Sequence, residues 1–162
     1  MCPFCRDLAG ALGRYLPTSG ERVRAYHKDF PLDLTCNARI GRTVHHGACE
    51  LAKGGICAAQ DGRFWEYHDK VYSRTWDHAT REDVLAIGEA VGVTRSAMSG
   101  CLDSATTKGR LAADIEEGFR IGVSSTPTVL INGRKLQSVN LFFLALDEEQ
   151  KRLGLPPLRT TP

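Results

Sequence analysis

The spacing of apolar residues predicts a chain built in the order helix, strand, block of helices, strand hairpin and helix. The block of helices is expected over about residues 45–122, with Thr80 and Thr94 as N-caps and a break near Asp61-Gly62. Gly92 is expected to end the helix that Thr80 begins. The helices outside the block are expected over about Pro3 to Tyr15, ending near Pro17, and over about Ser138 to Leu153.

Two segments have the pattern of β-strands. Glu21 to His27 is short and partly alternating, and the segment after it, Lys28 to Leu32, is expected to be a loop. Thr128 to Leu136 contains two short apolar runs around Asn132-Gly133, which is a strong hairpin signal. Strands that flank a block of helices predict an α/β sandwich with a helical insertion.

Length and composition indicate one domain. A chain of 162 residues can bury its own core, and we expect the domain to span residues 1–154, with a disordered tail over residues 155–162. The net charge of +2 does not indicate a nucleic-acid or anionic-membrane partner. The longest apolar run, Leu141 to Leu146, is too short to cross a bilayer, and no signal peptide is visible.

The motif Cys2-Pro3-Phe4-Cys5 is the most informative feature for chemistry. Two cysteines at this spacing can form and reopen a disulfide, and the helix that begins at the motif favours the reactive thiolate through its dipole. Pro3 suits the first position of that helix. The competing interpretations are half of a zinc site and a static disulfide. A zinc site normally needs a second ligand pair, and the other cysteines do not repeat the CxxC spacing.

The remaining four cysteines leave several pairings open. Six cysteines, at positions 2, 5, 36, 49, 57 and 101, favour an oxidising compartment. We favour a structural disulfide between Cys36 and Cys49; the alternatives are a second redox pair and a zinc site that includes His45 and His46. Cys57 and Cys101 are interpreted as core residues, with Cys36–Cys57 as a weaker alternative bridge.

Aromatic residues recur at helical spacing between Phe64 and Tyr72. This spacing predicts mostly core packing, with some of the rings at the rim of a substrate groove as an alternative. His27 and His68 are expected to be structural, although they could modulate the dithiol.

Two signals more than a hundred residues apart together carry a resemblance to a known family. Cys2-Pro3-Phe4-Cys5 begins a helix, and Gly122-Val123-Ser124-Ser125-Thr126-Pro127-Thr128 enters a strand. With Lys28 to Leu32, Ala48-Cys49-Glu50 and Gly62 to Asp69, these segments resemble the DsbA-like branch of the thioredoxin superfamily. The resemblance is closest to thioredoxin-like domains found alone or fused to vitamin K epoxide reductase homologues, and it covers nearly the whole chain.

The resemblance implies a thioredoxin-like fold and a protein-disulfide oxidoreductase, most simply an oxidant. Cys2 and Cys5 would be catalytic, with Cys2 the attacking, exposed sulfur and Cys5 its resolving partner. Thr126-Pro127 would form a cis peptide facing the dithiol and, with Pro3 and Phe4, would bind substrate. No cofactor or metal is needed. Partners would be cysteine-containing proteins and a membrane redox protein of the vitamin K epoxide reductase type, in the periplasm or another extracytoplasmic space.

Alternatives to this function stay open. A disulfide isomerase or reductase would keep the same fold, and a zinc-binding or holdase module would use the motif without catalysis. One departure from the family is clear, because only Met1 precedes Cys2 where the family has a central strand. We therefore expect the sequence to be a fragment begun at an internal methionine, with the strands at 21–27 and 128–131 lacking the partner between them.

Overall fold

The computed structural model describes residues 2–156 and divides into two compact units. Unit 1 comprises residues 2–3 and His27–Ser124, and unit 2 comprises Phe4–Tyr26 with the chain from Ser125 onward. Unit 1 therefore contains the helical block expected over about residues 45–122. The tail expected to be disordered falls mostly on residues 157–162, which lie outside the described residues.

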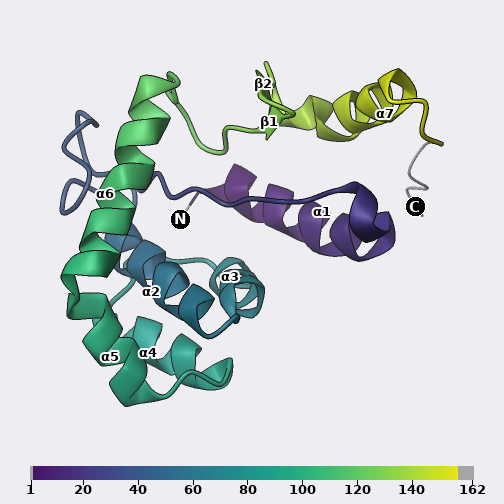
Figure 1. Cartoon of the computed structure of the whole chain (residues 1–162). Coiled ribbons are helices and arrows are strands. Elements are labelled where there is room, and N and C mark those ends of the chain that lie inside the picture. Colours follow the sequence, from purple (N-terminus) through teal and green to yellow (C-terminus); the bar gives the residue numbers. More distant parts are fainter. Residues whose placement is uncertain (1, 157–162) are drawn as a thin grey trace. The chain divides into compact units, whose positions relative to one another are not determined.

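Unit 1 contains five helices (Figure 1). Helix α2 packs against the other four, and α6 runs beside both α2 and α5. The N-caps predicted from the sequence are present: Thr80 and Asp83 form a capping box, and the Thr94 side chain accepts a hydrogen bond from the Ala97 amide. The helices are α2 (Ala48–Gln60), α3 (Phe64–Tyr72), α4 (Arg81–Ala90), α5 (Arg95–Asp103) and α6 (Ala105–Arg120).

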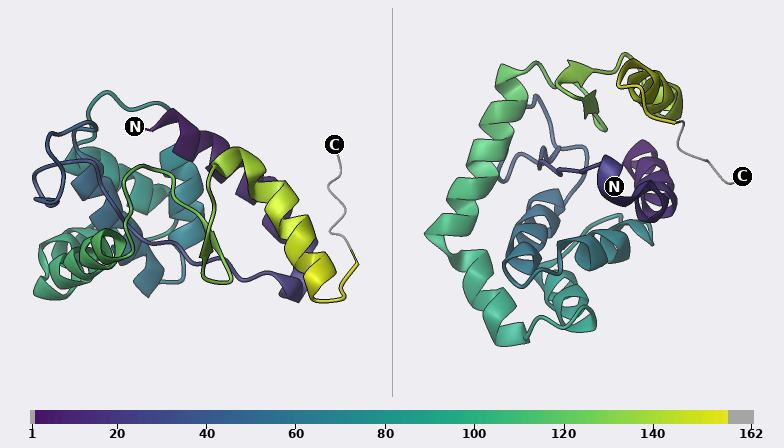
Figure 2. Two further views of the ribbon diagram at one scale, coloured as in Figure 1. Left: turned by 90° about the horizontal axis from the view of Figure 1, so that it is seen from above. Right: turned by 45° about the vertical axis from the view of Figure 1, so that its right-hand side comes forward.

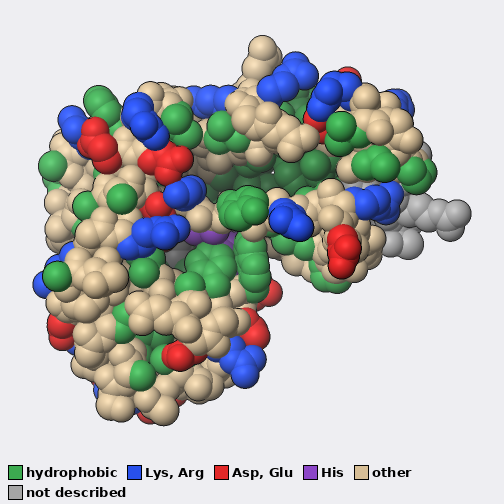
Figure 3. Space-filling view, viewed as in Figure 1, with side chains coloured by type: hydrophobic (Ala, Val, Ile, Leu, Met, Phe, Trp, Pro, Cys, Tyr) green, Lys and Arg blue, Asp and Glu red, His purple; other side chains and the backbone are tan. Residues whose placement is uncertain are grey.

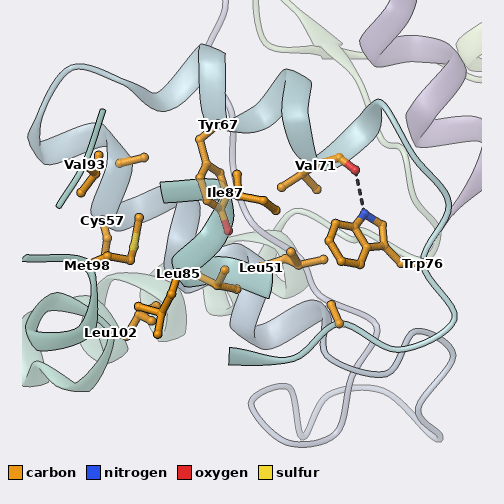
Figure 4. Packing of buried hydrophobic residues seen from close by; sticks show 13 residues of the cluster. Leu51, Cys57, Tyr67, Val71, Trp76, Leu85, Ile87, Val93, Met98 and Leu102 are labelled. Carbon is orange, nitrogen blue, oxygen red and sulfur yellow. Dashed lines mark hydrogen bonds between the residues drawn. The ribbon is translucent and has the colours of Figure 1, made fainter. Parts of the chain in front are cut away.

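The main core of unit 1 lies among α2, α3, α4 and α5, whose apolar side chains point toward one another (Figure 4). Trp76 closes one side, and its indole nitrogen donates a hydrogen bond to the Val71 carbonyl at 2.7 Å. Helices α2 and α3 approach closely at Gly54, where a Cβ atom would lie 2.1 Å from the Tyr67 hydroxyl. This position therefore needs glycine because there is no room for a side chain.

The segment that leads from His27 to α2 is fastened to the helices by charged groups. Lys28 Nζ lies 3.1 Å from Asp114 Oδ1 and 2.8 Å from Glu117 Oε2, both on α6. The Asp114 side chain is only 5% exposed, and it also accepts a hydrogen bond from the Asp29 amide. Because the Asp114 carboxylate contacts both the Lys28 side chain and the Asp29 amide, it holds this irregular segment against α6.

Unit 2 combines two helices with a small antiparallel sheet. Helix α1 (Pro3–Ser19) is followed by the 3-10 turn η1 (Gly20–Arg22), and the later half contains β1 (Leu130–Ile131), β2 (Arg134–Lys135), η2 (Val139–Leu141) and α7 (Phe142–Arg152). Figure 2 shows the β1–β2 hairpin close to α7. The register pairs Leu130 with Lys135 and Ile131 with Arg134. Tyr15, Phe142 and Leu146 form the buried centre of this unit.

The predicted strand at Glu21–His27 is wrong. Residues 20–22 form η1, and residues 23–27 are not assigned to a strand. Val23 has extended backbone angles, but the sheet within the described residues holds only β1 and β2, so no neighbouring strand pairs with this segment. The hairpin around Asn132-Gly133 is confirmed, and both of these residues have positive φ angles.

The surface shows no dominant charge. On the face seen in Figure 3, acidic and basic side chains are interspersed over unit 1, in keeping with the net charge of +2. Within residues 2–156, no helix has the length and apolar character needed to cross a bilayer.

Candidate functional site

The Cys2-Pro3-Phe4-Cys5 motif occupies the start of α1. Pro3 is the first helical residue, so Cys2 stands in the N-cap position and Cys5 in the first turn. Both sulfurs therefore lie where the helix dipole is positive, as the sequence predicted.

The expected exposure of Cys2 is wrong. Only 8% of Cys2 is exposed, whereas Cys5 is half-buried and Phe4 is 62% exposed. The sequence argument expected helix geometry to expose the first cysteine of the motif. Because Cys2 precedes the first helical residue, helix geometry does not by itself set its exposure.

The second predicted element of the site is the Thr126-Pro127 peptide bond, which is cis, as the resemblance implied. Thr126 and Pro127 are half-buried, and the Thr128 hydroxyl donates a hydrogen bond to the Ser125 carbonyl at 2.7 Å. This turn and Cys5 both belong to unit 2. A substrate-binding role for Thr126, Pro127, Pro3 and Phe4 stays a prediction.

Cys36 and Cys49 form a disulfide with an S–S distance of 2.00 Å. It is the pairing favoured from the sequence, and it joins the loop before α2 to the second residue of that helix. The alternative zinc site at Cys36, His45, His46 and Cys49 is wrong, because both cysteine sulfurs are in the disulfide. Within residues 2–156, no group of three or more histidine, cysteine or acidic side chains is arranged to hold a metal ion.

Cys57 and Cys101 form a second disulfide, which the sequence analysis missed. Their interpretation as core residues is confirmed, because Cys57 belongs to the main core and Cys101 packs against it, but the alternative Cys36–Cys57 bridge is wrong. Cys57 on α2 and Cys101 on α5 face each other across the main core, with their Cα atoms 5.8 Å apart. Only the packing of α2 against α5 brings them together, and a sequence separation of 44 residues gives no local signal for it.

Asp33 is a further structural residue that the sequence analysis missed. Its side chain is buried and accepts hydrogen bonds from the Thr35 amide and hydroxyl and from the Gly47 amide. Burial by itself raises the pKa of Asp33, but these hydrogen bonds, with one from the Cys49 amide, outweigh it and hold the pKa below its ordinary value. The Asp-x-Thr spacing was the signal that could have found this turn.

Most of the aromatic residues between Phe64 and Tyr72 are structural, as predicted. Tyr67 and Val71 are buried in the main core, and only Trp65 is substantially exposed. His68 is 7% exposed, and its Nδ1 atom lies 3.1 Å from Asp69 Oδ1. The His27 ring lies edge-on to the His68 ring with a centroid distance of 5.6 Å, and His27 Nε2 lies 3.3 Å from Asp29 Oδ1.

The crystal structure of the thiol-disulfide exchange protein α-DsbA2 from Wolbachia pipientis matches with a TM-score of 0.70 and 14% sequence identity. The match covers 91% of this chain and 76% of that one. It shows that the chain has a thioredoxin-like fold of the DsbA type with a helical insertion, in agreement with the fold class predicted from the sequence.

The relatives found by sequence are transport proteins. The Na⁺/H⁺ antiporter NhaA 3 of Salinispora tropica is 29% identical over 134 residues, which are 83% of this chain and 19% of the antiporter. The antiporter NhaA of Herminiimonas arsenicoxydans is 30% identical over 137 residues, which are 84% of this chain and 20% of the antiporter. The chain therefore spans about a fifth of the length of these relatives. They give no support to the association with vitamin K epoxide reductase homologues.

A family model described as Thioredoxin matches residues 1–142. The matched region includes the CxxC motif at the start of α1, all five helices of unit 1, the cis bond before Pro127 and the hairpin. From this match and the geometry above, we conclude that the chain belongs to the thioredoxin family.

Proposed function

We propose that this protein is a thiol–disulfide oxidoreductase that exchanges disulfides with the cysteines of protein substrates through Cys2 and Cys5. The observation that carries the proposal is the position of the motif, with one sulfur at the N-cap and the other in the first turn of a 17-residue helix. Membership of the thioredoxin family supports the same chemistry. The thiol-disulfide exchange protein α-DsbA2 has the same fold.

The N-cap position suits Cys2 to act as the nucleophile and leaving group. A side-chain acceptor at this position can receive hydrogen bonds from the amides of the second and third helical residues, which here are Phe4 and Cys5. These amides and the helix dipole both stabilise negative charge on the Cys2 sulfur. Because a stabilised thiolate leaves readily, the same arrangement favours donation of the Cys2–Cys5 disulfide to a substrate.

The reaction in the oxidising direction has two displacement steps. A substrate thiolate attacks the Cys2 sulfur of the Cys2–Cys5 disulfide, and Cys5 leaves as a thiolate that takes up a proton. A second substrate thiolate then attacks the substrate sulfur of the mixed disulfide and releases the Cys2 thiolate. The substrate loses two electrons to form its disulfide, and the protein gains them as the Cys2–Cys5 dithiol.

An oxidising compartment is part of the proposal. All four cysteines outside the motif are paired in disulfides, which persist in the periplasm and other extracytoplasmic spaces. In the antiporter relatives, a segment similar to this chain is part of a membrane transporter, which supports work beside a membrane. A membrane redox protein, for example of the vitamin K epoxide reductase type, would then reoxidise the dithiol.

Trapping of the mixed disulfide tests the exchange directly. The Cys5→Ser variant should accumulate a mixed disulfide when its Cys2 thiolate attacks a disulfide-bonded peptide and releases one peptide thiolate, because the resolving thiol is absent, whereas Cys2→Ser should not. Oxidative refolding of reduced ribonuclease should be accelerated by the unmodified protein and by neither variant. Unchanged acceleration by both variants would overturn the proposal.

The direction of exchange requires a separate measurement. Equilibration of the protein in glutathione buffers, followed by alkylation and mass spectrometry of the motif peptide, gives its reduction potential. A value near about −120 mV, as for DsbA, supports the oxidising role. A value near about −270 mV, as for thioredoxin, would contradict oxidation and support the reductase alternative.

A further inference from the structure

A cavity of about 320 Å³ lies in unit 1 beside the Cys36–Cys49 disulfide. Its walls are the loop before α2, the first turns of α2 and one side of α6. Its volume is at the lower end of the range, about 300–1,000 Å³, of pockets that hold small molecules. The disulfide lines the cavity, so a bound molecule can reach a reactive bond.

The two cysteines of this disulfide differ in exposure. Cys36 is partly exposed, whereas Cys49 is 3% exposed and lies deeper in the fold. An attacking thiolate therefore reaches Cys36, and Cys49 is the leaving group. The Cys57–Cys101 disulfide does not line this cavity, and it provides an internal comparison within the same chain.

Three charged side chains line the cavity: Glu50, Lys53 and Lys108. Glu50 pairs through Oε1 with Lys53, but its Oε2 atom is buried and has no hydrogen-bond partner. A buried carboxylate oxygen without a partner is costly, and an ammonium group would satisfy it. Lys108 on α6 lines the same cavity, and within residues 2–156 no carboxylate lies within 4.0 Å of its ammonium group.

We propose that this cavity binds a low-molecular-weight thiol with an α-amino-acid head, such as cysteine, and that the Cys36–Cys49 disulfide exchanges with it. The ammonium group of the thiol would bind the Glu50 carboxylate, its carboxylate would bind Lys108, and its sulfur would face Cys36. The proposal uses unit 1 alone and does not depend on the function proposed for Cys2 and Cys5.

The exchange balances as a two-electron reduction by two thiols. The first thiolate attacks the Cys36 sulfur, forms a mixed disulfide and releases the Cys49 thiolate, which takes a proton from solvent. A second thiolate then attacks the sulfur of the bound thiol, so that the external disulfide forms and the Cys36 thiolate is released. The protein gains two electrons, and the two thiols become one disulfide.

The surroundings of Cys49 can accommodate the reduced form. Cys49 is the second residue of α2, where the dipole favours a thiolate, and Lys53 lies one turn further along the same helix. The ionised carboxylate of Asp33 opposes this effect, so the thiolate is transient. The Asp33 carbonyl oxygen lies 3.4 Å from the Cys49 sulfur and can accept its S–H group after protonation.

The test uses a protein with Cys2→Ser and Cys5→Ser, so that the motif takes no part. This protein is incubated at neutral pH with cysteine, cysteamine, 3-mercaptopropionate or 2-mercaptoethanol, then alkylated and mapped by mass spectrometry. The rates are corrected for the thiolate fraction of each reagent. Cysteine should then open Cys36–Cys49 about tenfold faster than cysteamine, which lacks the carboxylate, or 3-mercaptopropionate, which lacks the ammonium group. A factor of about ten is what one charged hydrogen bond contributes. Cys57–Cys101 should stay closed.

Two variants of residues that line the cavity separate binding there from general reactivity. Lys108→Met and Glu50→Gln should each slow the reaction with cysteine about tenfold and leave the reaction with 2-mercaptoethanol unchanged. Lys70→Met, which removes an exposed lysine from α3 outside the cavity, should change neither rate. Equal opening of the two disulfides, or equal corrected rates for all four thiols, would overturn the proposal whatever the result for Cys2 and Cys5.

Discussion

The carboxylate of Asp33 accepts a hydrogen bond from the Gly47 amide at 2.9 Å and is itself only 2% exposed. This contact joins the start of the loop to the residue that precedes α2. Gly47 has a φ angle of +80°, and a Cβ atom there would lie 1.9 Å from the Ala79 carbonyl oxygen. The loop that carries Cys36 is therefore fixed by a buried charge and by a glycine as well as by its disulfide.

The Asp33→Ala variant should lose about 2–3 kcal/mol of unfolding free energy, because it leaves the Thr35 and Gly47 donors without their ionic acceptor. The folded pKa of Asp33 is depressed, so its contribution is fully present above the unfolded pKa of about 3.9. That contribution is lost as the pH falls through the folded pKa. Urea unfolding between neutral and acidic pH measures both effects, and an unchanged acid profile in Asp33→Asn would contradict the assignment.

Substitution of Gly54 tests the close contact between α2 and α3. Gly54→Ala should destabilise unit 1 by about 1–3 kcal/mol, because the added methyl group overlaps the Tyr67 hydroxyl and a Val84 methyl group. The control is Gly100→Ala on α5, which meets nothing within 4 Å and should stabilise the protein by about 0.5–1 kcal/mol. Thermal unfolding monitored by circular dichroism compares the stability of the two variants. Equal changes in stability would show that Gly54 is not in tight contact with Tyr67.

Loss of the two disulfides should have unequal effects. Removal of Cys57–Cys101, which closes a sequence separation of 44 residues, should cost about 4 kcal/mol in the chain-entropy model. Removal of Cys36–Cys49, with a separation of 13, should cost about 3 kcal/mol. Denaturant unfolding of the two double Cys→Ala variants measures the loss of unfolding free energy for each disulfide. A larger loss for Cys36–Cys49 than for Cys57–Cys101 would contradict the prediction.

His68 should make the protein less stable in mild acid. Burial lowers the pKa of His68 in the folded state, although the Asp69 hydrogen bond opposes this, and burial also lowers the pKa of His45. The unfolded state binds protons more readily, so stability falls as the pH drops below the unfolded value of about 6.5. His68→Phe keeps an aromatic ring at this position and should flatten part of this decline in urea titrations. An unchanged profile would contradict the role of His68.

Local signals in the sequence were sufficient for most of the helices and the hairpin. Thr80 with Asp83 begins α4 because the two side chains satisfy the first amides, and this motif is contained in four residues. Asn132-Gly133 gives the hairpin because both residues accept positive φ angles. Such features depend on residues that are close in sequence, so the local sequence pattern predicts them.

The features that the sequence analysis missed depend on distant parts of the chain. Cys57 meets Cys101 only because α2 packs against α5, and Asp33 becomes a buried acceptor only when Gly47 folds over it. The segment at 23–27 has strand-like residues, but a strand also requires a partner, and the described sheet supplies none. The low exposure of Cys2 is likewise something that helix geometry alone does not give.

The discontinuity of unit 2 has a consequence for synthesis on the ribosome. Residues 4–26 emerge first, but Tyr15 packs with Phe142 and Leu146, which are made only after residues 27–124. At about 5–20 residues per second, helix α1 waits on the order of 5–20 s for these contacts. Unit 1 can complete its helix caps and its core in that interval. Cys5 is therefore made well before the residues that complete its own unit.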